Sequence, residues 1–151
     1  MTSASSRCCS SHSALRLGLL LAGTQRFLSL LAVLRPGSGQ WDLMNQEINS
    51  GAVRIVRDYT GRGPTKARSV IDANSVTVLL ADTLTPGERR LAESGKADHV
   101  LTTRHEFQKV MRDDLVKLVE DTLERKVIAF MSANHIDPDM GVEVFVLEPV
   151  S

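Results

Sequence analysis

Cysteine is nearly absent from this chain of 151 residues: the only two, Cys8 and Cys9, are adjacent and lie close to the amino terminus. Adjacent cysteines rarely bridge each other, so the sequence provides neither a disulfide framework nor a cysteine-based zinc site. The folded part is therefore expected to rely on an ordinary hydrophobic core, which a chain of this length can bury in one domain. A reducing cytoplasm is the compartment that this composition favours.

Acidic residues are absent from residues 1–41, which hold four arginines. An uninterrupted long apolar run is missing as well, because Arg26 lies between the apolar residues 17–22 and the apolar residues 27–34. An arginine at the centre of a membrane helix costs about 2.5–3.5 kcal/mol on insertion scales. The sequence therefore disfavours a transmembrane helix in this leader.

Three interpretations of the leader remain open. It is a short signal peptide, an Arg- and Ser-rich targeting or surface-binding segment, or an extension that is no structural part of the protein. The third is favoured, either as a disordered extension or as sequence upstream of a true start at Met44. Helical periodicity begins at Met44, and the Pro-Gly-Ser-Gly sequence of residues 36–39 has the composition of a linker. We therefore expect a single domain over residues 44–150.

Basic residues are not in excess in that domain. From residue 42 onward the sequence has 14 Lys and Arg against 18 Asp and Glu, a net charge of −4. Nucleic-acid binding usually needs a basic stripe, so we expect no nucleic-acid partner. A Ser-His-Asp pattern, a cysteine nucleophile and a metal-ligand cluster are also lacking, so we assign no catalytic residue, metal or cofactor and favour a non-enzymatic role.

Apolar periodicity and turn residues predict seven elements. In chain order they are a helix over 44–59, strands over 70–72 and 76–81, a short helix over 86–95, a long helix over 103–123, and strands over 127–133 and 142–147. The order α-β-β-α-α-β-β predicts an α+β fold with a four-stranded, largely antiparallel sheet. The long helix is expected to cover one face of that sheet.

Local signals set the expected helix ends. Gly61 is placed to end the first helix in a left-handed conformation. Thr85 and Glu88 form a capping box, and a second capping box at Thr103 and Glu106 is expected to open the long helix. Leu115 and Leu118 of the long helix are expected to face the sheet. The whole expected apolar stripe of that helix is Phe107, Val110, Met111, Leu115, Leu118, Val119 and Leu123.

Several short motifs in one order resemble the MpsC-like domain family. They are Gly61-Arg62-Gly63-Pro64-Thr65-Lys66-Ala67, Leu84-Thr85-Pro86-Gly87-Glu88-Arg89, Arg104 with Phe107, Arg125-Lys126-Val127, Asp137-Pro138-Asp139 and Val144-Phe145-Val146-Leu147-Glu148. Many members of that family have a glycine just before the Arg-Lys pair, where this chain has Glu124. The resemblance spans residues 44–150 and provides no established active site to carry over.

The resemblance implies an accessory role beside a Na⁺-translocating, membrane-potential-generating system. The expected partner is a protein, such as a component of a membrane transport complex, and the sequence is also compatible with a homo-oligomer. The expected location is cytoplasmic, with attachment to the membrane periphery as an open alternative.

The best candidate for a binding surface is the loop of residues 61–68. Its cations Arg62, Lys66 and Arg68 lie within seven residues, its glycines permit close approach to the backbone, and Arg104 is a further candidate. The binding residues so predicted are Gly61, Arg62, Gly63, Pro64, Lys66, Arg68 and Arg104. A partner protein and a small anion or nucleotide are the two ligands considered, against the alternative that the loop is only a helix cap and a turn.

Other polar groups have structural interpretations that we prefer. The segment His135-Ile136-Asp137-Pro138-Asp139 is typical of a turn rather than of a metal site. Glu106 is explained by capping rather than by acid–base chemistry with His105, and His99 supports no specific role. The pair of residues 113–114, both aspartate, is expected on a solvated helix face.

Overall fold

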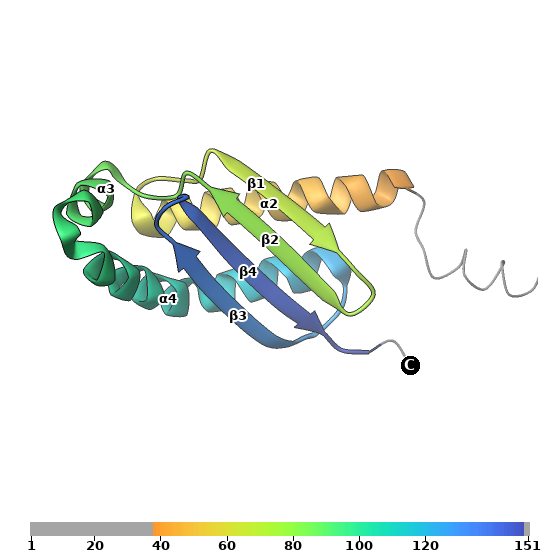
Figure 1. The fold of residues 1–151 in the computed structure, drawn as a ribbon. Coiled ribbons are helices and arrows are strands. Elements are labelled where there is room, and N and C mark those ends of the chain that lie inside the picture. The colour runs from red at the N-terminus through yellow and green to blue at the C-terminus, as the bar shows by residue number, and fades with distance from the viewer. Residues whose placement is uncertain (1–37, 150–151) are drawn as a thin grey trace, which may run out of the picture. The chain divides into compact units, whose positions relative to one another are not determined.

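The computed structural model describes residues 38–149 (Figure 1). In chain order the elements are α2 (Ser38–Thr60), β1 (Lys66–Ile71), β2 (Ser75–Ala81), α3 (Pro86–Leu91), the π-helical segment η1 (Ala92–Lys96), α4 (Ala97–Leu123), β3 (Val127–His135) and β4 (Met140–Leu147). This confirms the expected α+β class and element order. The interpretations offered for the leader concern residues 1–41; residues 1–37 lie outside the described residues, and residues 38–41 belong to α2.

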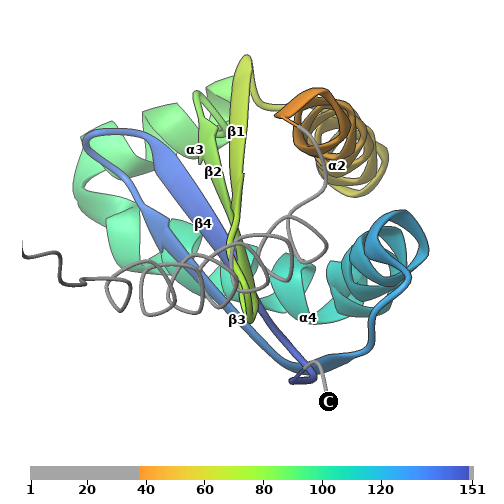
Figure 2. The same ribbon diagram turned by 90° about the vertical axis from the view of Figure 1, so that its right-hand side faces the viewer.

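The four strands form one antiparallel sheet in the order β1-β2-β4-β3. Helices α2 and α4 both lie on the same face of this sheet, which Figure 2 shows nearly edge-on. Hereafter the face against these helices is the inner face, and the opposite one is the outer face.

Alternating side chains of the strands build the core on the inner face. Val76, Val78 and Leu80 of β2 and Phe145 and Leu147 of β4 are all buried. Opposite them pack apolar residues that recur at helical spacing in α2 and α4, namely Ile48, Ala52, Ile55, Val56, Met111, Leu115 and Val119. The long-helix packing expected from the sequence is confirmed, with α2 as a second covering helix.

Two expected helix starts were wrong. Helix α2 begins at Ser38 rather than at Met44, so part of the expected linker is helical. Helix α4 begins at Ala97, and Thr103 lies inside it with its hydroxyl donating to the carbonyl of His99 at 2.9 Å. The break before α4 is instead made by Gly95, whose φ of 79° interrupts the helical backbone. The capping box at Thr85 is confirmed in both of its hydrogen bonds.

The apolar stripe of α4 also differs from the expected one. Val110 is 62% exposed, whereas Arg104 and Gln108 are buried. Leu118 packs over Gly51 of α2, where a Cβ atom would come within 2.5 Å of its side chain, so it serves the contact between the helices. The polarity of Arg104 and Gln108 had concealed their place on the buried face, which a purely apolar pattern cannot reveal.

Glu124 ends α4 in the left-handed region, with φ 51° and ψ 35°. This is the position at which the sequence departs from the glycine of the family pattern. Glycine adopts such a conformation without a Cβ penalty. We expect Glu124→Gly to raise the free energy of unfolding by about 0.5–1 kcal/mol in urea denaturation. Asp121→Gly, in the regular part of the same helix, is expected to lower it by roughly 0.3–0.5 kcal/mol, the difference in helix propensity between the two residues; a loss in both variants would contradict this explanation.

Candidate functional site

One end of the sheet brings together three loops. The outermost paired row there consists of Lys66, Ala81, Met140 and His135, one residue from each strand. The connections 61–65, 82–85 and 136–139 therefore lie at this end, and α3 adjoins them (Figure 1). Three of the motifs found in the sequence, the Gly-Pro loop, the helix start at Thr85 and the Asp-Pro-Asp turn, thus meet at one place.

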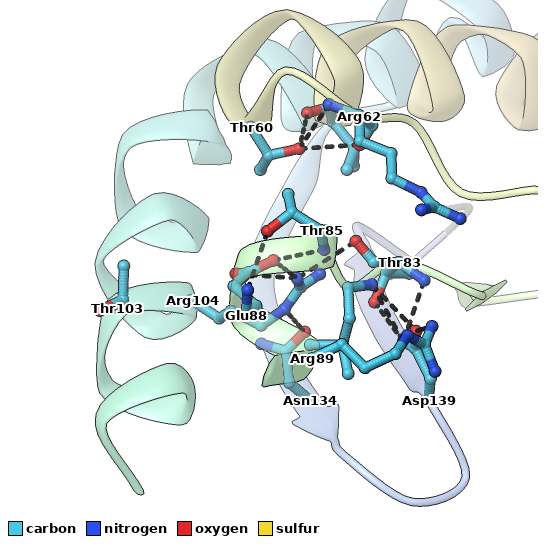
Figure 3. A network of polar contacts seen from close by, with 12 residues as sticks. Thr60, Arg62, Thr83, Thr85, Glu88, Arg89, Thr103, Arg104, Asn134 and Asp139 are labelled. Carbon is cyan, nitrogen blue, oxygen red and sulfur yellow. Dashed lines mark hydrogen bonds and ion pairs between the residues drawn. The ribbon is translucent and has the colours of Figure 1, made fainter. Parts of the chain in front are cut away.

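Arg104 is the centre of a buried polar network at this end (Figure 3). Its Nη1 lies 3.2 Å from Glu88 Oε2 and 3.3 Å from the carbonyl oxygen of Thr83, and its Nε donates to Asn134 Oδ1 at 3.2 Å. Glu88 also accepts from the backbone N–H of Thr85 at 2.7 Å. The Arg104 side chain therefore connects α4 with the start of α3, the end of β2 and strand β3.

Asp139 forms the second part of the network. Its carboxylate accepts from the backbone N–H and the hydroxyl of Thr83 at 2.9 and 2.8 Å and from the backbone N–H of Leu84 at 3.0 Å. Arg89 Nη2 lies 3.1 Å from the same carboxylate and is half exposed. The turn between β3 and β4 is thereby attached to the loop that leads into α3.

The contacts of Arg104 and Asp139 indicate that both side chains have a structural role. Charged groups that are buried cost several kcal/mol unless they are paired and hydrogen-bonded, and these groups have partners within the fold. A surface groove of about 370 Å³ lies beside Arg89 and Asp139, but those two charges are already paired. The network therefore holds the end of the sheet together and presents no unoccupied acid–base pair.

Glu143 is the most perturbed ionisable group of the inner face. It is 2% exposed, and Gln108 Nε2 lies 3.4 Å from its Oε1, while its Oε2 has no partner in the described part of the chain. Burial raises the pKa of Glu143 to about 7, although Ser132, Gln108 and the charge of Arg104 act in the opposite direction. The adjacent cavity of about 10 Å³ has room for about one water molecule and none for a substrate.

This raised pKa gives a testable pH dependence. Between the ordinary value of 4.5 and about pH 7 the folded chain binds more protons at Glu143 than the unfolded chain does, so stability falls as the pH rises through this window. Glu143→Gln keeps the shape and removes the titration. We expect the variant to lose this slope and to gain on the order of 1–3 kcal/mol at pH 8. The control is Glu148→Gln, at an exposed position; a slope unchanged in Glu143→Gln would contradict the assignment.

The backbone of the Gly-Pro loop requires glycine at both of its glycine positions. Gly61 has a φ of 77°, and its N–H donates to the carbonyl of Arg57 at 2.8 Å, which confirms the expected helix end. A Cβ atom on Gly63 would come within 3.1 Å of the carbonyl oxygen of Val53, so a larger residue there would press against α2. Pro64 is buried. These three residues shape the turn between α2 and β1.

The predicted cations of this region do not all come together. Lys66 and Arg68 are exposed and occupy alternate positions of β1, so they point to the outer face. The backbone of Arg62 is partly buried: its N–H donates to the Thr60 hydroxyl oxygen, and its carbonyl accepts from the same hydroxyl. Figure 3 shows the Arg62 side chain pointing away from the Arg104 network. Arg104 is buried in that network and does not join the surface of the loop.

The other polar residues considered as metal ligands or acid–base groups either lie apart from one another or bond to groups within the fold. Residues 38–149 contain no group of three or more His, Cys, Asp or Glu that could hold a metal ion. His135 contacts the carbonyl of Pro138 through Nδ1 at 2.9 Å, within its own turn. His99, His105 and Glu106 are exposed on α4, where Glu106 pairs with Lys109 at 2.7 Å. Asp114 is exposed, as expected, and accepts from the Tyr59 hydroxyl at 2.8 Å.

Sequence reasoning missed Glu143, Gln108 and Asn134. One signal was present for Glu143, which alternates with Gly141, Phe145 and Leu147 in β4. That set is less apolar than the alternating Val142, Val144 and Val146, so hydrophobicity alone would have placed the valines inside. Gln108 follows Arg104 by one helical turn, a spacing that becomes informative only once Arg104 is known to be buried.

Comparisons with known proteins give one match. A family model described as "Na+-translocating membrane potential-generating system (MpsC)" matches residues 42–149, well over half of the chain. The same comparisons found neither a curated protein nor a solved structure that matches the chain. In the described range 38–149, no helix combines the length and the apolar character that crossing a bilayer requires.

Proposed function

The chain belongs to the MpsC family, and on that premise we propose that its domain is a non-catalytic accessory module of a Na⁺-translocating, membrane-potential-generating system. In this proposal the module acts from the cytoplasmic side and reaches the membrane system by binding one of its protein components. The loop and strand residues 61–68 form the contact surface.

The observation that carries this proposal is the placement of Lys66 and Arg68. Both are exposed, two residues apart on the edge strand β1, and aimed at the outer face, with Arg62 in the preceding loop. Exposed charges contribute only about 0–1 kcal/mol to folding, so stability does not require this row. A cationic row on a net-acidic domain suits an acidic surface of a partner, which it would orient and attract.

The alternative, a small anion or nucleotide site in the same loop, has weaker support. Anion sites of this kind use free backbone N–H groups. Here the N–H groups of Gly61, Arg62 and Thr65 donate to groups of the fold, and Pro64 has none. The cations are left to act as a surface, which favours a partner protein.

A triple substitution tests the proposal. In the full chain, purified with an affinity tag from its native cells, Arg62→Glu, Lys66→Glu and Arg68→Glu should leave the circular dichroism spectrum unchanged and abolish recovery of the partner. The control carries the same change of charge at exposed helix positions, Arg54→Glu, Arg90→Glu and Arg112→Glu, and should retain the partner. Equal recovery by wild type and the first variant would contradict the proposal, and so would an unfolded variant, because it would assign these cations to the fold.

A further inference from the structure

Glu143 and Arg104 line the same small cavity on the inner face of the sheet. Its volume of about 10 Å³ is that of about one water molecule, so the two side chains lie close together across it. Among the described residues that line this cavity, these two are the only ones with a charged group. The polar residues beside them are neutral, among them Thr60, Gln108 and Asn134.

The carboxyl group of Glu143 has no ionic partner of its own. It is 2% exposed, its Oε2 has no hydrogen-bond partner in the described part of the chain, and Gln108, 3.4 Å from Oε1, is neutral. Ser132 lies opposite it in the pairing of β3 with β4, and the Ser132 Oγ is also buried without a partner. A buried carboxylate is costly unless a cation reaches it, and Arg104 is the cation that lines the cavity.

Arg104 is held by a different carboxylate in the structure. Its Nη1 lies 3.2 Å from both carboxylate oxygens of Glu88. The Glu88 side chain is 13% exposed and belongs to α3, a helix that has no buried residue. A small movement of α3 would bring Glu88 into water, whereas Glu143 is enclosed by the core. One arginine therefore lies within reach of two carboxyl groups of unequal burial.

We propose that Glu143, Arg104 and Glu88 form a pH-sensitive switch that controls the attachment of α3. When Glu143 is protonated, Arg104 pairs with Glu88, as the structure has it (Figure 3). When Glu143 releases its proton to the solvent, Arg104 turns to the new carboxylate and Glu88 passes into water. The arginine follows the more deeply buried charge, because that charge loses more free energy when it is left unpaired. This switch is independent of the proposed function.

The start of α3 is the part of the fold that responds. Glu88 accepts from the backbone N–H of Thr85 at 2.7 Å, so its departure opens one half of the capping box. Asp139 keeps its own bonds to the loop of residues 82–85, which stays attached. Burial raises the pKa of Glu143 to about 7, which places the response near neutral pH.

His135 also lies at this end of the sheet, and histidine changes its charge in the same pH range. Asn134, its neighbour in β3, bonds to Arg104 on the inner face, so the side chain of His135 points to the outer face. The His135 Nδ1 contacts the carbonyl of Pro138 at 2.9 Å, within its own turn. His135→Asn therefore removes this second titration without altering the cavity.

The test follows two N–H groups of the full chain by ¹H–¹⁵N NMR from about pH 5.5 to about pH 8.5. They are Nε–H of Arg104, which donates to Asn134, and the backbone N–H of Thr85, which donates to Glu88. We expect both signals to shift with one midpoint, together with the ¹³C signal of the Glu143 carboxyl group. Hydrogen exchange of the α3 amides, corrected for the intrinsic effect of pH, should become roughly tenfold faster over this range.

Three variants serve as comparisons in the same titration. Glu143→Gln should abolish the shifts of both N–H groups. Glu148→Gln, at an exposed carboxylate, and His135→Asn should preserve them. If Glu143→Gln does not fold, the wild-type chain decides, because the midpoints of its three signals must coincide.

Each other outcome overturns the inference. A shift of the carboxyl signal alone shows that Glu143 ionises without recruiting Arg104. A shift of the Arg104 signal without that of Thr85 shows that Glu88 is not released. Shifts that persist in Glu143→Gln belong to another group, and signals that stay constant over the whole range show that the switch does not exist.

Discussion

Arg104→Ala is expected to lower the free energy of unfolding by about 3–5 kcal/mol, measured by urea denaturation at one fixed protein concentration. The arginine is 6% exposed and pairs with Glu88 at 3.2 Å. Its removal leaves Glu88 short of its counter-charge and leaves the Thr83 carbonyl and Asn134 without a donor. Because Glu88 also caps α3, the start of that helix should loosen together with the end of the sheet.

The control for this result is Arg89→Ala. Arg89 also forms an ion pair, with Asp139 at 3.1 Å, but its side chain is 48% exposed. Water replaces much of such a contact, so a loss of no more than about 1 kcal/mol is expected. Equal losses for the two arginines would show that burial of the Arg104 network is not what stabilises this end of the sheet.

Leu115→Ala is expected to cost about 2–5 kcal/mol, because it removes a fully buried side chain from the centre of the contact between α4 and the sheet. Leu115 is 1% exposed and belongs to the main core cluster. The change creates a cavity whose walls, built from neighbouring helices and strands, can collapse only partly. The same denaturation experiment measures the loss.

Val110→Ala provides the comparison within the same helix. Both residues were expected in one apolar stripe, yet Val110 is 62% exposed. Its truncation should change the stability by no more than about 0.5 kcal/mol. A loss similar to that of Leu115→Ala would contradict the register of α4 described above.

Local signals were sufficient to predict the elements and their order. The capping box of Thr85 and Glu88, the left-handed stop at Gly61 and the alternation of Val76, Val78 and Leu80 each depend on neighbouring residues only. The two hairpins followed from turn residues. Such features can be predicted from a sequence because the groups that cause them lie within a few positions of one another.

Features that depend on distant residues were not predicted. Arg104 is buried because Glu88, Asn134 and the end of β2 surround it, and no residue near it in sequence indicates this. The start of α4 was placed at Thr103 because a capping-box sequence occurs there, although the turn before it is already helical. The strand β1 was placed too late, at residue 70, because its outward positions carry Lys66 and Arg68.

The candidate site was predicted only in part for the same reason. The cations of residues 61–68 were identified from their spacing, but their separation into a surface row and a half-buried loop residue depends on how β1 joins the sheet. Arg104 was included with them on the basis of charge alone. Its place in the buried network assigns it to the stability of the domain and leaves the outer surface of β1 as the proposed contact.

The most direct test of this account is photo-crosslinking from single positions of the full chain in native cells. A photoreactive residue at Arg68, on the outer surface of β1, should form an adduct with a protein component of a Na⁺-translocating membrane system. The same residue at Lys117, exposed on α4, should not. Adducts with such a component from position 117 and none from position 68 would contradict the proposal that β1 carries the partner surface.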